Sequence, residues 1–185
     1  MKGALLLVFY LLMGLNHAVA SEISTVREPE DSVSVIVSEA MSVLYNDFSK
    51  AIVLLKAADS LAVISKDPVE ISRVAHSFGV AYYVKGEYGT SLKYFLKGGE
   101  ISRTHNNKIG IAKGLVGQGL IQQGIDRHSE AINLFRQAIQ AYSEAENYEA
   151  ANPAFLNIAI SEIDLGDYDN AKKNLETAIQ LLSTR

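Results

Sequence analysis

The stretch Gly86-Glu87-Tyr88-Gly89-Thr90-Ser91 returns in altered form as Gly166-Asp167-Tyr168-Asp169-Asn170-Ala171, and the distance between the two decides the fold. That distance equals two periods of about 40 residues, and the same period organises the rest of the chain. Four positions of the period each keep one chemical character: small, large and apolar, small again, and mostly aromatic. They are Ala51, Ser91, Ala131 and Ala171; Leu55, Phe95, Phe135 and Leu175; Ala58, Gly98, Ala138 and Ala178; and Phe48, Tyr88, His128 and Tyr168. Four registers in phase indicate four copies of one unit and a stacked repeat architecture.

Each copy has the pattern of two helices joined by a short turn. In the second copy, apolar residues recur three and four positions apart up to Tyr82, the pattern stops at Gly86, and it resumes from Tyr88 to Phe95. No segment alternates apolar and polar residues strictly enough to indicate a strand. The sequence therefore predicts an all-α fold of eight helices, at about residues 31–45, 48–64, 68–85, 88–104, 108–124, 128–145, 152–165 and 168–183.

Prolines and glycines mark the ends of these helices. The three prolines each fall at the predicted start of the first helix of a copy, where their missing N–H is not needed: Pro29, Pro68 and Pro153. Asp67 and Asn152 immediately precede two of them and are the predicted N-caps, and Asp67 with Glu70 has the spacing of a capping box. Gly86 and Gly166 lie in the turns inside their copies, where a left-handed residue ends a helix without strain.

The phased residues resemble the tetratricopeptide repeat. The second copy carries the resemblance in Phe78-Gly79, Tyr82, Gly86, Tyr88, Ser91, Phe95 and Gly98, and the fourth in Ile158-Ala159, Gly166, Tyr168, Ala171, Leu175 and Ala178. The third copy has Asp126 in place of the usual turn glycine, and the first has Glu39 in place of a small residue. The resemblance covers residues 32–183 and implies a right-handed α-solenoid of four helix-turn-helix repeats, at about 31–66, 67–106, 107–147 and 148–185.

The repeat is longer than the usual tetratricopeptide unit of about 34 residues. We place the additional residues at the far ends of the helices, around 62–70, 102–110 and 142–152. This spacing is similar to the long-repeat variant found in kinesin light chains and in bacterial quorum-peptide receptors. HEAT and armadillo arrays share the period, but they lack the Gly-x-Tyr-x-x-Ala turn that residues 86–91 and 166–171 approximate.

The N-terminal residues have the pattern of a secretory signal peptide. Lys2 precedes an apolar run from Ala4 to Leu15, and Ala18-Val19-Ala20 follows as a small-residue cleavage site. The run is shorter than the roughly 20 apolar residues of a transmembrane helix, and an uncleaved membrane anchor is the alternative interpretation. We expect cleavage after Ala20, a flexible lead-in at 21–30, a repeat domain at 31–185 without a membrane span, and a periplasmic or secreted protein.

Composition argues against several classes of function. The chain has a formal net charge of −4, and losing Lys2 with the signal peptide makes the mature chain more negative. Lysine and arginine form no cluster that could neutralise a run of phosphates, so nucleic-acid binding is not expected. The absence of cysteine excludes disulfides and thiolate metal sites.

No arrangement of residues predicts catalysis, a metal site or a cofactor. The histidines after Ala20 are His76, His105 and His128, and no two of them have the spacing of metal ligands. His128 occupies the aromatic register and is predicted to be a packing residue, His105 falls in a loop, and His76 has a candidate functional position. The glycine-rich run at 114–119 has the wrong order for a phosphate-binding loop and lies in the middle of a predicted helix. We expect a protein that is not an enzyme.

The resemblance also implies a concave surface lined by the first helix of each repeat. The groove positions of the family fall, by phase, on Arg73, His76, Val80 and Tyr83; on Lys113, Val116, Leu120 and Gln123; and on Leu156, Ile160, Ile163 and Asp164. Most of these are apolar, while Arg73 and Lys113 are cations at equivalent places on adjacent helices. The predicted partner is an apolar helix or extended peptide segment with an acidic group near these cations. Two alternatives stay open: Arg73 only pairs with Glu70, or the apolar positions pack on the lead-in, on a dimer mate or on each other.

The last predicted helix ends the array without a polar cap. Ile179, Leu181 and Leu182 lie on or near the face that a further repeat would cover, and they are the candidates for self-association. The leading hypothesis is a non-catalytic protein- or peptide-binding adaptor or scaffold. The alternatives are a ligand-sensing input module, related to the repeat segments of bacterial signalling proteins, and a homo-oligomerising structural module.

Overall fold

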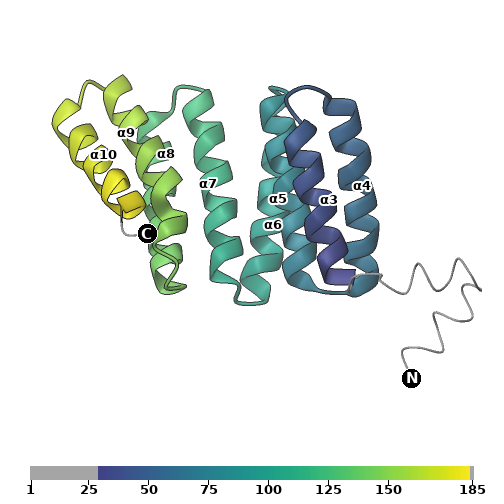
Figure 1. Cartoon of the computed structure of the whole chain (residues 1–185). Helices are drawn as coiled ribbons and strands as arrows, with labels where there is room; N and C mark the ends of the chain where they lie inside the picture. Colours follow the sequence, from purple (N-terminus) through teal and green to yellow (C-terminus); the bar gives the residue numbers. More distant parts are fainter. Residues whose placement is uncertain (1–28, 184–185) are drawn as a thin grey trace, which may run out of the picture.

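The structure is a computed structural model, and it describes residues 29–183. Within these residues the chain forms eight α-helices and one short 3₁₀ helix, which confirms the predicted all-α fold of two-helix repeats (Figure 1). The elements are α3 (Pro29–Val43), α4 (Phe48–Ser65), α5 (Pro68–Val84), α6 (Tyr88–Thr104), α7 (Lys108–Gly124), α8 (His128–Glu144), η1 (Glu149–Ala151), α9 (Asn152–Asp164) and α10 (Tyr168–Ser183). Every predicted helix end lies within two residues of the observed one.

Two predictions fall wholly or mostly on residues that the structure does not describe. The predicted signal peptide, 1–20, lies outside the described residues, and so does most of the predicted lead-in, 21–30. Pro29 and Glu30, the last residues of that lead-in, belong to α3, which begins two residues earlier than predicted. Among the described helices, none is both long enough and apolar enough to cross a membrane.

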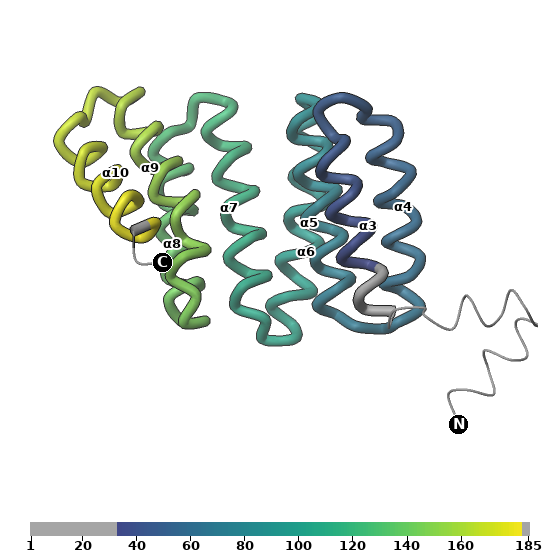
Figure 2. The backbone as a smooth tube through the Cα atoms, in the orientation of Figure 1, coloured from purple at the N-terminus to yellow at the C-terminus, as the bar shows by residue number. Residues whose placement is uncertain are grey.

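The helices form a stack of hairpins in two layers. Each α-helix packs on the next one in the sequence, and the first helices of successive repeats also contact one another, α3 on α5, α5 on α7 and α7 on α9. We call the layer of first helices, α3, α5, α7 and α9, the inner layer. Figure 2 shows the chain passing through the hairpins in order, from α3 and α4 at one end to α9 and α10 at the other. Such stacking buries the apolar face that a single hairpin leaves open.

The turns inside the second, third and fourth repeats each depend on one residue in the left-handed backbone region. Gly86 and Gly166 both have a φ of 79°, which glycine adopts without strain, as predicted. Asp126 takes the equivalent place in the third repeat with a φ of 61°. After α5 the turn closes with a hydrogen bond from the Glu87 N–H to the Tyr82 carbonyl at 2.9 Å, which satisfies a carbonyl that the helix end leaves free.

The start of α5 confirms one predicted cap and corrects another. Asp67 is the N-cap, because its Oδ1 accepts a hydrogen bond from the Val69 N–H at 2.8 Å. The predicted capping box with Glu70 is wrong. Glu70 pairs with Arg73 instead, with 3.1 Å between Oε1 and Nη2, and the Asp67 N–H donates to Ser65 Oγ at 3.2 Å.

The predicted N-cap at Asn152 is also wrong. The 3₁₀ helix η1 runs directly into α9, so the backbone is already helical at Ala151, with φ −77° and ψ −15°, and no extended residue precedes the helix. The buried Asn152 side chain donates from Nδ2 to the Ala178 carbonyl of α10 at 2.5 Å. Asn152 therefore links the two helices of the fourth repeat.

Aromatic side chains that meet glycines bring neighbouring helices close together. Phe95 on α6 is buried between Gly79 on α5 and Gly117 on α7. A Cβ placed at Gly79 would come within 2.7 Å of the Phe95 ring, and one placed at Gly117 within 2.2 Å. Phe135 meets Gly119 in the same way, with 2.5 Å from its ring to a Cβ placed there. The small residues of the repeat thus permit close packing, and the large ones fill the space that remains.

We expect Gly117→Ala to destabilise the protein although alanine is the better helix former. The added methyl would overlap the Phe95 ring, and such overpacking costs about 1–3 kcal/mol, against a gain in helix propensity of about 1 kcal/mol. Gly99→Ala is the matched control, because the nearest atoms to its Cβ would lie 3.9 Å and 4.0 Å away. Urea unfolding should give a lower free energy for Gly117→Ala and an unchanged or higher one for Gly99→Ala. Equal stabilities of the two variants would contradict the role of the Phe95 contact.

Candidate ligand-binding site

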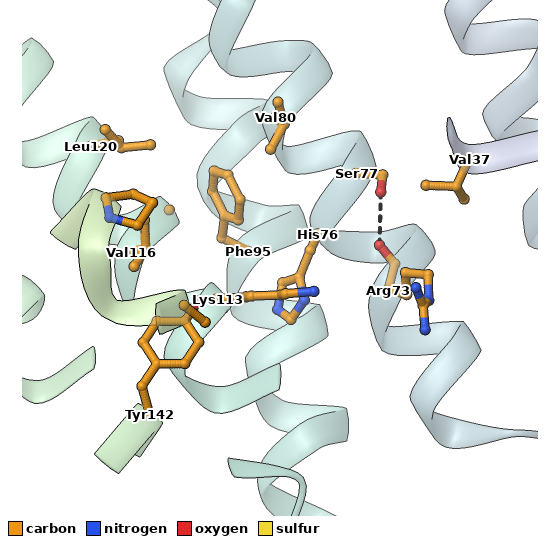
Figure 3. A pocket seen from close by; sticks show the side chains of 13 residues that line it. Val37, Arg73, His76, Ser77, Val80, Phe95, Lys113, Val116, Leu120 and Tyr142 are labelled. Atoms are coloured by element: carbon orange, nitrogen blue, oxygen red, sulfur yellow. Dashed lines mark hydrogen bonds between the residues drawn. The ribbon is translucent and has the colours of Figure 1, made fainter. Parts of the chain in front are cut away.

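A pocket of about 340 Å³ lies on the inner layer. Six of the predicted groove residues line it: Arg73, His76 and Val80 on α5, and Lys113, Val116 and Leu120 on α7 (Figure 3). Its other lining residues are not among the predicted ones: Val37, Ser77, Phe95, Gly117, Tyr142, Ala150 and Pro153. Val37 comes from the first repeat and Pro153 from the fourth, so residues of all four repeats border the pocket.

Two other predicted groove residues are engaged by neighbouring side chains. Tyr83 stacks on Tyr88, with 5.5 Å between the ring centroids. Gln123 donates from Nε2 to Ser161 Oγ at 2.9 Å and also reaches the Asn157 carbonyl at 3.1 Å. Both side chains lie outside the pocket lining and connect one helix to another.

Three further predicted groove residues lie along α9. Leu156, Ile160 and Ile163 are exposed, and their spacing of four and three positions places them on one side of the helix. We call them the α9 stripe. They do not line the pocket, so the structure divides the predicted groove into a pocket and a separate exposed apolar stripe.

The two other histidines among residues 29–183, His105 and His128, do not line the pocket. His128 is mostly buried and lies between two carboxylates, with Nε2 3.8 Å from Asp126 Oδ1 and Nδ1 3.7 Å from Asp164 Oδ2. Asp164, the last predicted groove residue, therefore lies beside the turn of the third repeat. His105 is exposed at the end of α6, and its Nδ1 is 2.9 Å from the Ile101 carbonyl.

His76 is a buried imidazole that lines the pocket. It is 5 % exposed, and its ring lies against glycines on two helices. A Cβ placed at Gly98 would come within 2.6 Å of the ring, and one placed at Gly114 within 3.3 Å of Nε2. Neither ring nitrogen has a hydrogen-bond partner in the described part of the chain. Burial, and then the charge of Lys113, lower the pKa of His76 from 6.5 to about 4, so the imidazole is neutral near neutral pH, with one donor and one acceptor nitrogen.

Two cations, Arg73 and Lys113, border the pocket beside His76. Arg73 pairs with Glu70, a buried carboxylate, but its own Nε is buried without a partner among residues 29–183. Figure 3 shows the Lys113 side chain extending toward His76. Lys113 has much of its length exposed, yet partial burial and then the charge of Arg73 lower the pKa of its ammonium, against an opposing effect of Glu70.

The polar groups stand at one side of a mainly apolar space. A smaller hollow of about 150 Å³ shares Arg73, His76 and Lys113 with the pocket, so these three side chains border both spaces. Among the described residues, no group of three or more His, Asp or Glu could hold a metal ion. The arrangement suits non-covalent binding of a ligand that has both an apolar and an anionic part.

Comparison with known proteins agrees with this architecture. Residues 153–181, which span α9 and most of α10, match the tetratricopeptide repeat family. The fourth hairpin is thus similar to a tetratricopeptide repeat. The other hairpins share its register and its helix pattern. No curated protein matches the sequence.

Two solved structures share the fold of this chain at low sequence identity. Aspartyl phosphate phosphatase F from Bacillus subtilis is similar with a TM-score of 0.72 and 14 % identity, over 89 % of this chain and 43 % of that one. BtubC (BKLC) from P. vanneervenii is similar with a TM-score of 0.64 and 15 % identity, over 86 % of this chain and 75 % of that one. The chain thus spans less than half the length of the phosphatase.

We expect the stability of the repeat domain to fall on acidification because of His76. Folding lowers the pKa of His76 from 6.5 to about 4, so between these values the unfolded chain binds the proton more tightly than the folded one. The stability due to the neutral imidazole is therefore fully present above the unfolded pKa and is lost as the pH falls toward the folded pKa. At about pH 5 the loss corresponds to about 2 kcal/mol.

His76→Phe is the variant that tests this, because it removes the titrating group and keeps a planar ring in the same place. Between neutral pH and about pH 5, the unfolding free energy of the wild type should fall by about 2 kcal/mol more than that of the variant. Chemical unfolding at the two pH values measures the difference. A difference that does not change with pH would contradict the burial of a neutral imidazole.

Proposed function

We propose that this tetratricopeptide domain is a non-catalytic adaptor that binds a partner protein by docking a peptide segment of it on the inner layer. The apolar pocket between α5 and α7 carries the proposal. Stacked helical hairpins present extended curved surfaces that suit protein partners, and the pocket lies on the layer that the resemblance associates with binding. The cations Arg73 and Lys113 at its border favour a segment with an acidic group nearby.

The size of the pocket favours an extended segment over a whole helix. At about 340 Å³ it falls near the lower end of the roughly 300–1,000 Å³ of small-ligand sites, enough for one large apolar side chain and part of its backbone. Interfaces commonly concentrate their binding free energy in such an anchor residue. The α9 stripe offers further apolar contacts for residues that flank the anchor.

We further propose that the adaptor acts in the periplasm or outside the cell. The support for this location is the sequence of residues 1–20, with its basic start, short apolar run and small residues before the cleavage point. Peptide capture is consistent with such a location, because it requires neither a cofactor nor an energy source.

A displayed random peptide library tests the adaptor proposal. Peptides selected on the wild-type protein should lose at least about tenfold in affinity for Val80→Glu/Leu120→Glu, because the two carboxylates would enter an apolar pocket. Val53→Glu/Val63→Glu is the matched control, since both valines are exposed on α4, which contributes no residue to the pocket. Circular dichroism checks that all variants are folded. Equal binding of the selected peptides by the pocket variant would overturn the assignment of the pocket.

The surface of α10 favours self-association as a second candidate function. Ile179 and Leu182 are 64 % and 58 % exposed on this helix, whereas Leu181, the third predicted contact residue, is partly buried. Two large apolar side chains exposed one turn apart form the start of an apolar patch that a second copy of the chain could cover.

We expect Ile179→Glu/Leu182→Glu to convert a wild-type dimer into a monomer without lowering the melting temperature of the monomer. In the dimer the added charges would lie in the subunit interface, whereas in the monomer they would lie on the solvent-exposed surface. Light scattering over a range of protein concentrations measures the change. A wild type that stays monomeric throughout that range rules out this function.

A further inference from the structure

The outward side of the first repeat carries apolar residues that the repeat pattern does not require. We call the second helices, α4, α6, α8 and α10, the outer layer. On α4, Val53, Val63 and Ile64 are each more than half exposed. At the equivalent positions the other three repeats have only polar residues: Lys93, Asn133 and Lys173; Arg103, Ser143 and Ser183; Thr104, Glu144 and Thr184. The packing of the stack therefore accepts polar side chains at all three places.

The second repeat continues this surface with alternating apolar and basic side chains. α4 and α6 both pack on α5, so the two outer helices flank the same inner helix. Residues at equivalent positions point to the same side of a repeat stack, and here Val53 is equivalent to Lys93 and Lys56 to Leu96. All of these side chains are exposed. We call the surface formed by the following residues the outer patch: Val53, Lys56, Val63 and Ile64 on α4, and Lys93, Leu96 and Lys97 on α6.

The outer patch is positive although the chain as a whole is negative. α4 and α6 together carry five basic and two acidic residues, whereas α8 and α10 carry three basic and four acidic residues. Two of the five cations pair with carboxylates, Lys50 with Glu39 and Arg103 with Glu100. The other three cations belong to the outer patch and form no ion pair within residues 29–183. Asp59 is the second acidic residue of the two helices, so three lysines face one carboxylate.

This combination of charge and apolar surface fits a lipid bilayer better than it fits a protein. A second copy of the chain, related by a two-fold axis, would bring the lysines of the two patches together, and like charges oppose association. An acidic protein would match the charge, but protein partners usually bury an anchor residue in a recess. Neither of the two hollows described above is lined by a residue of the outer patch. A bilayer needs no such recess, because its lipids rearrange around the side chains that enter it.

We propose that the outer patch binds the surface of a bilayer that contains anionic phospholipid. Val53, Val63 and Ile64 enter the boundary between headgroups and acyl chains. The lysine side chains lie along this surface and hold their ammonium groups at the level of the phosphates. Each such lysine contributes about fivefold to the affinity for an anionic membrane. The pocket lies on the inner layer, so a domain bound in this way keeps its proposed peptide-binding side free.

Co-sedimentation with lipid vesicles tests the charge component of the proposal. The wild type should bind vesicles of equal parts phosphatidylcholine and phosphatidylglycerol at least about tenfold more tightly than vesicles of phosphatidylcholine alone, and added salt should weaken the binding. Lys93→Gln/Lys97→Gln should lower the affinity for the anionic vesicles at least about tenfold. Lys172→Gln/Lys173→Gln is the matched control, because it removes the same charge from exposed positions of α10. It should change the affinity by less than about twofold.

A second variant tests the apolar component at constant charge. Val53→Asn/Val63→Ser gives α4 the residues that α8 has at the equivalent positions, Asn133 and Ser143, so the fold should tolerate them. Removing two exposed valines from the contact with lipid should lower the affinity at least about tenfold. Circular dichroism checks that each variant is folded. All variants keep residues 1–28, so vesicle binding by the apolar run Ala4 to Leu15 would persist in every one of them.

The outcomes separate this inference from the adaptor proposal. A wild type that does not bind anionic vesicles, or patch variants that bind them as the wild type does, overturn the inference. A wild-type dimer that ignores vesicles and dissociates in Val53→Asn/Val63→Ser also overturns it, because a second copy then covers the patch. The pocket variant Val80→Glu/Leu120→Glu should still bind vesicles, and Val53→Asn/Val63→Ser should still bind the selected peptides. Vesicle binding without peptide selection leaves the inference standing and the adaptor refuted, and the reverse result does the opposite.

Discussion

The contact of the Phe95 ring with two glycines is the constraint on which the rest of the site depends. The ring lies between Gly79 of its own repeat and Gly117 of the next, so one side chain sets the separation of α5, α6 and α7. The glycines that hold His76 lie one turn away on two of these helices, at Gly98 on α6 and Gly114 on α7. A larger residue beside Phe95 would separate the helices and open the place of the imidazole at the same time. The stability of the stack and the shape of the pocket therefore have one cause.

The composition of α7 shows how far this constraint extends. Glycine in a helix interior costs about 1 kcal/mol relative to alanine, and α7 contains Gly110, Gly114, Gly117, Gly119 and Gly124. Its helical state must come mainly from packing against its neighbours, as in most short protein helices. Four of these glycines meet an aromatic ring: Gly114 meets His76, Gly117 meets Phe95, Gly119 meets Phe135 and Gly124 meets Tyr88. Local propensity thus yields to tertiary packing along a helix that also contributes Lys113, Val116 and Leu120 to the pocket.

The repeat could be predicted almost completely because its signals are local. Gly86 needs a positive φ wherever the repeat is placed, and Pro68 suits the first turn of a helix whatever packs on it. The cap at Asn152 failed for a reason that is not local, since η1 makes the preceding backbone helical and α10 offers the carbonyl of Ala178 to its side chain. The sequence pattern contains the cap residue but not the competing partner.

The pocket could be predicted only in part, because its borders depend on how neighbouring helices pack. Phase alone places Val80 and Leu120 on the inner layer, and both line the pocket. The same reasoning places Tyr83 and Gln123 there, but each is engaged by a neighbouring helix. Val37 from the first repeat also lines the pocket, because α3 packs directly against α5. Phase gives the direction of a side chain, whereas the packing of neighbouring helices decides which side chains meet.

His76 shows why a site of this kind conflicts with stability. The stack would gain from an aliphatic residue at this place, as in the other three repeats, because a neutral imidazole with two free nitrogens is a cost to the folded state. Natural proteins often retain such costs where function needs them. The pocket is bordered by residues from the first to the fourth repeat, so the packing around His76 involves the whole array and not one hairpin.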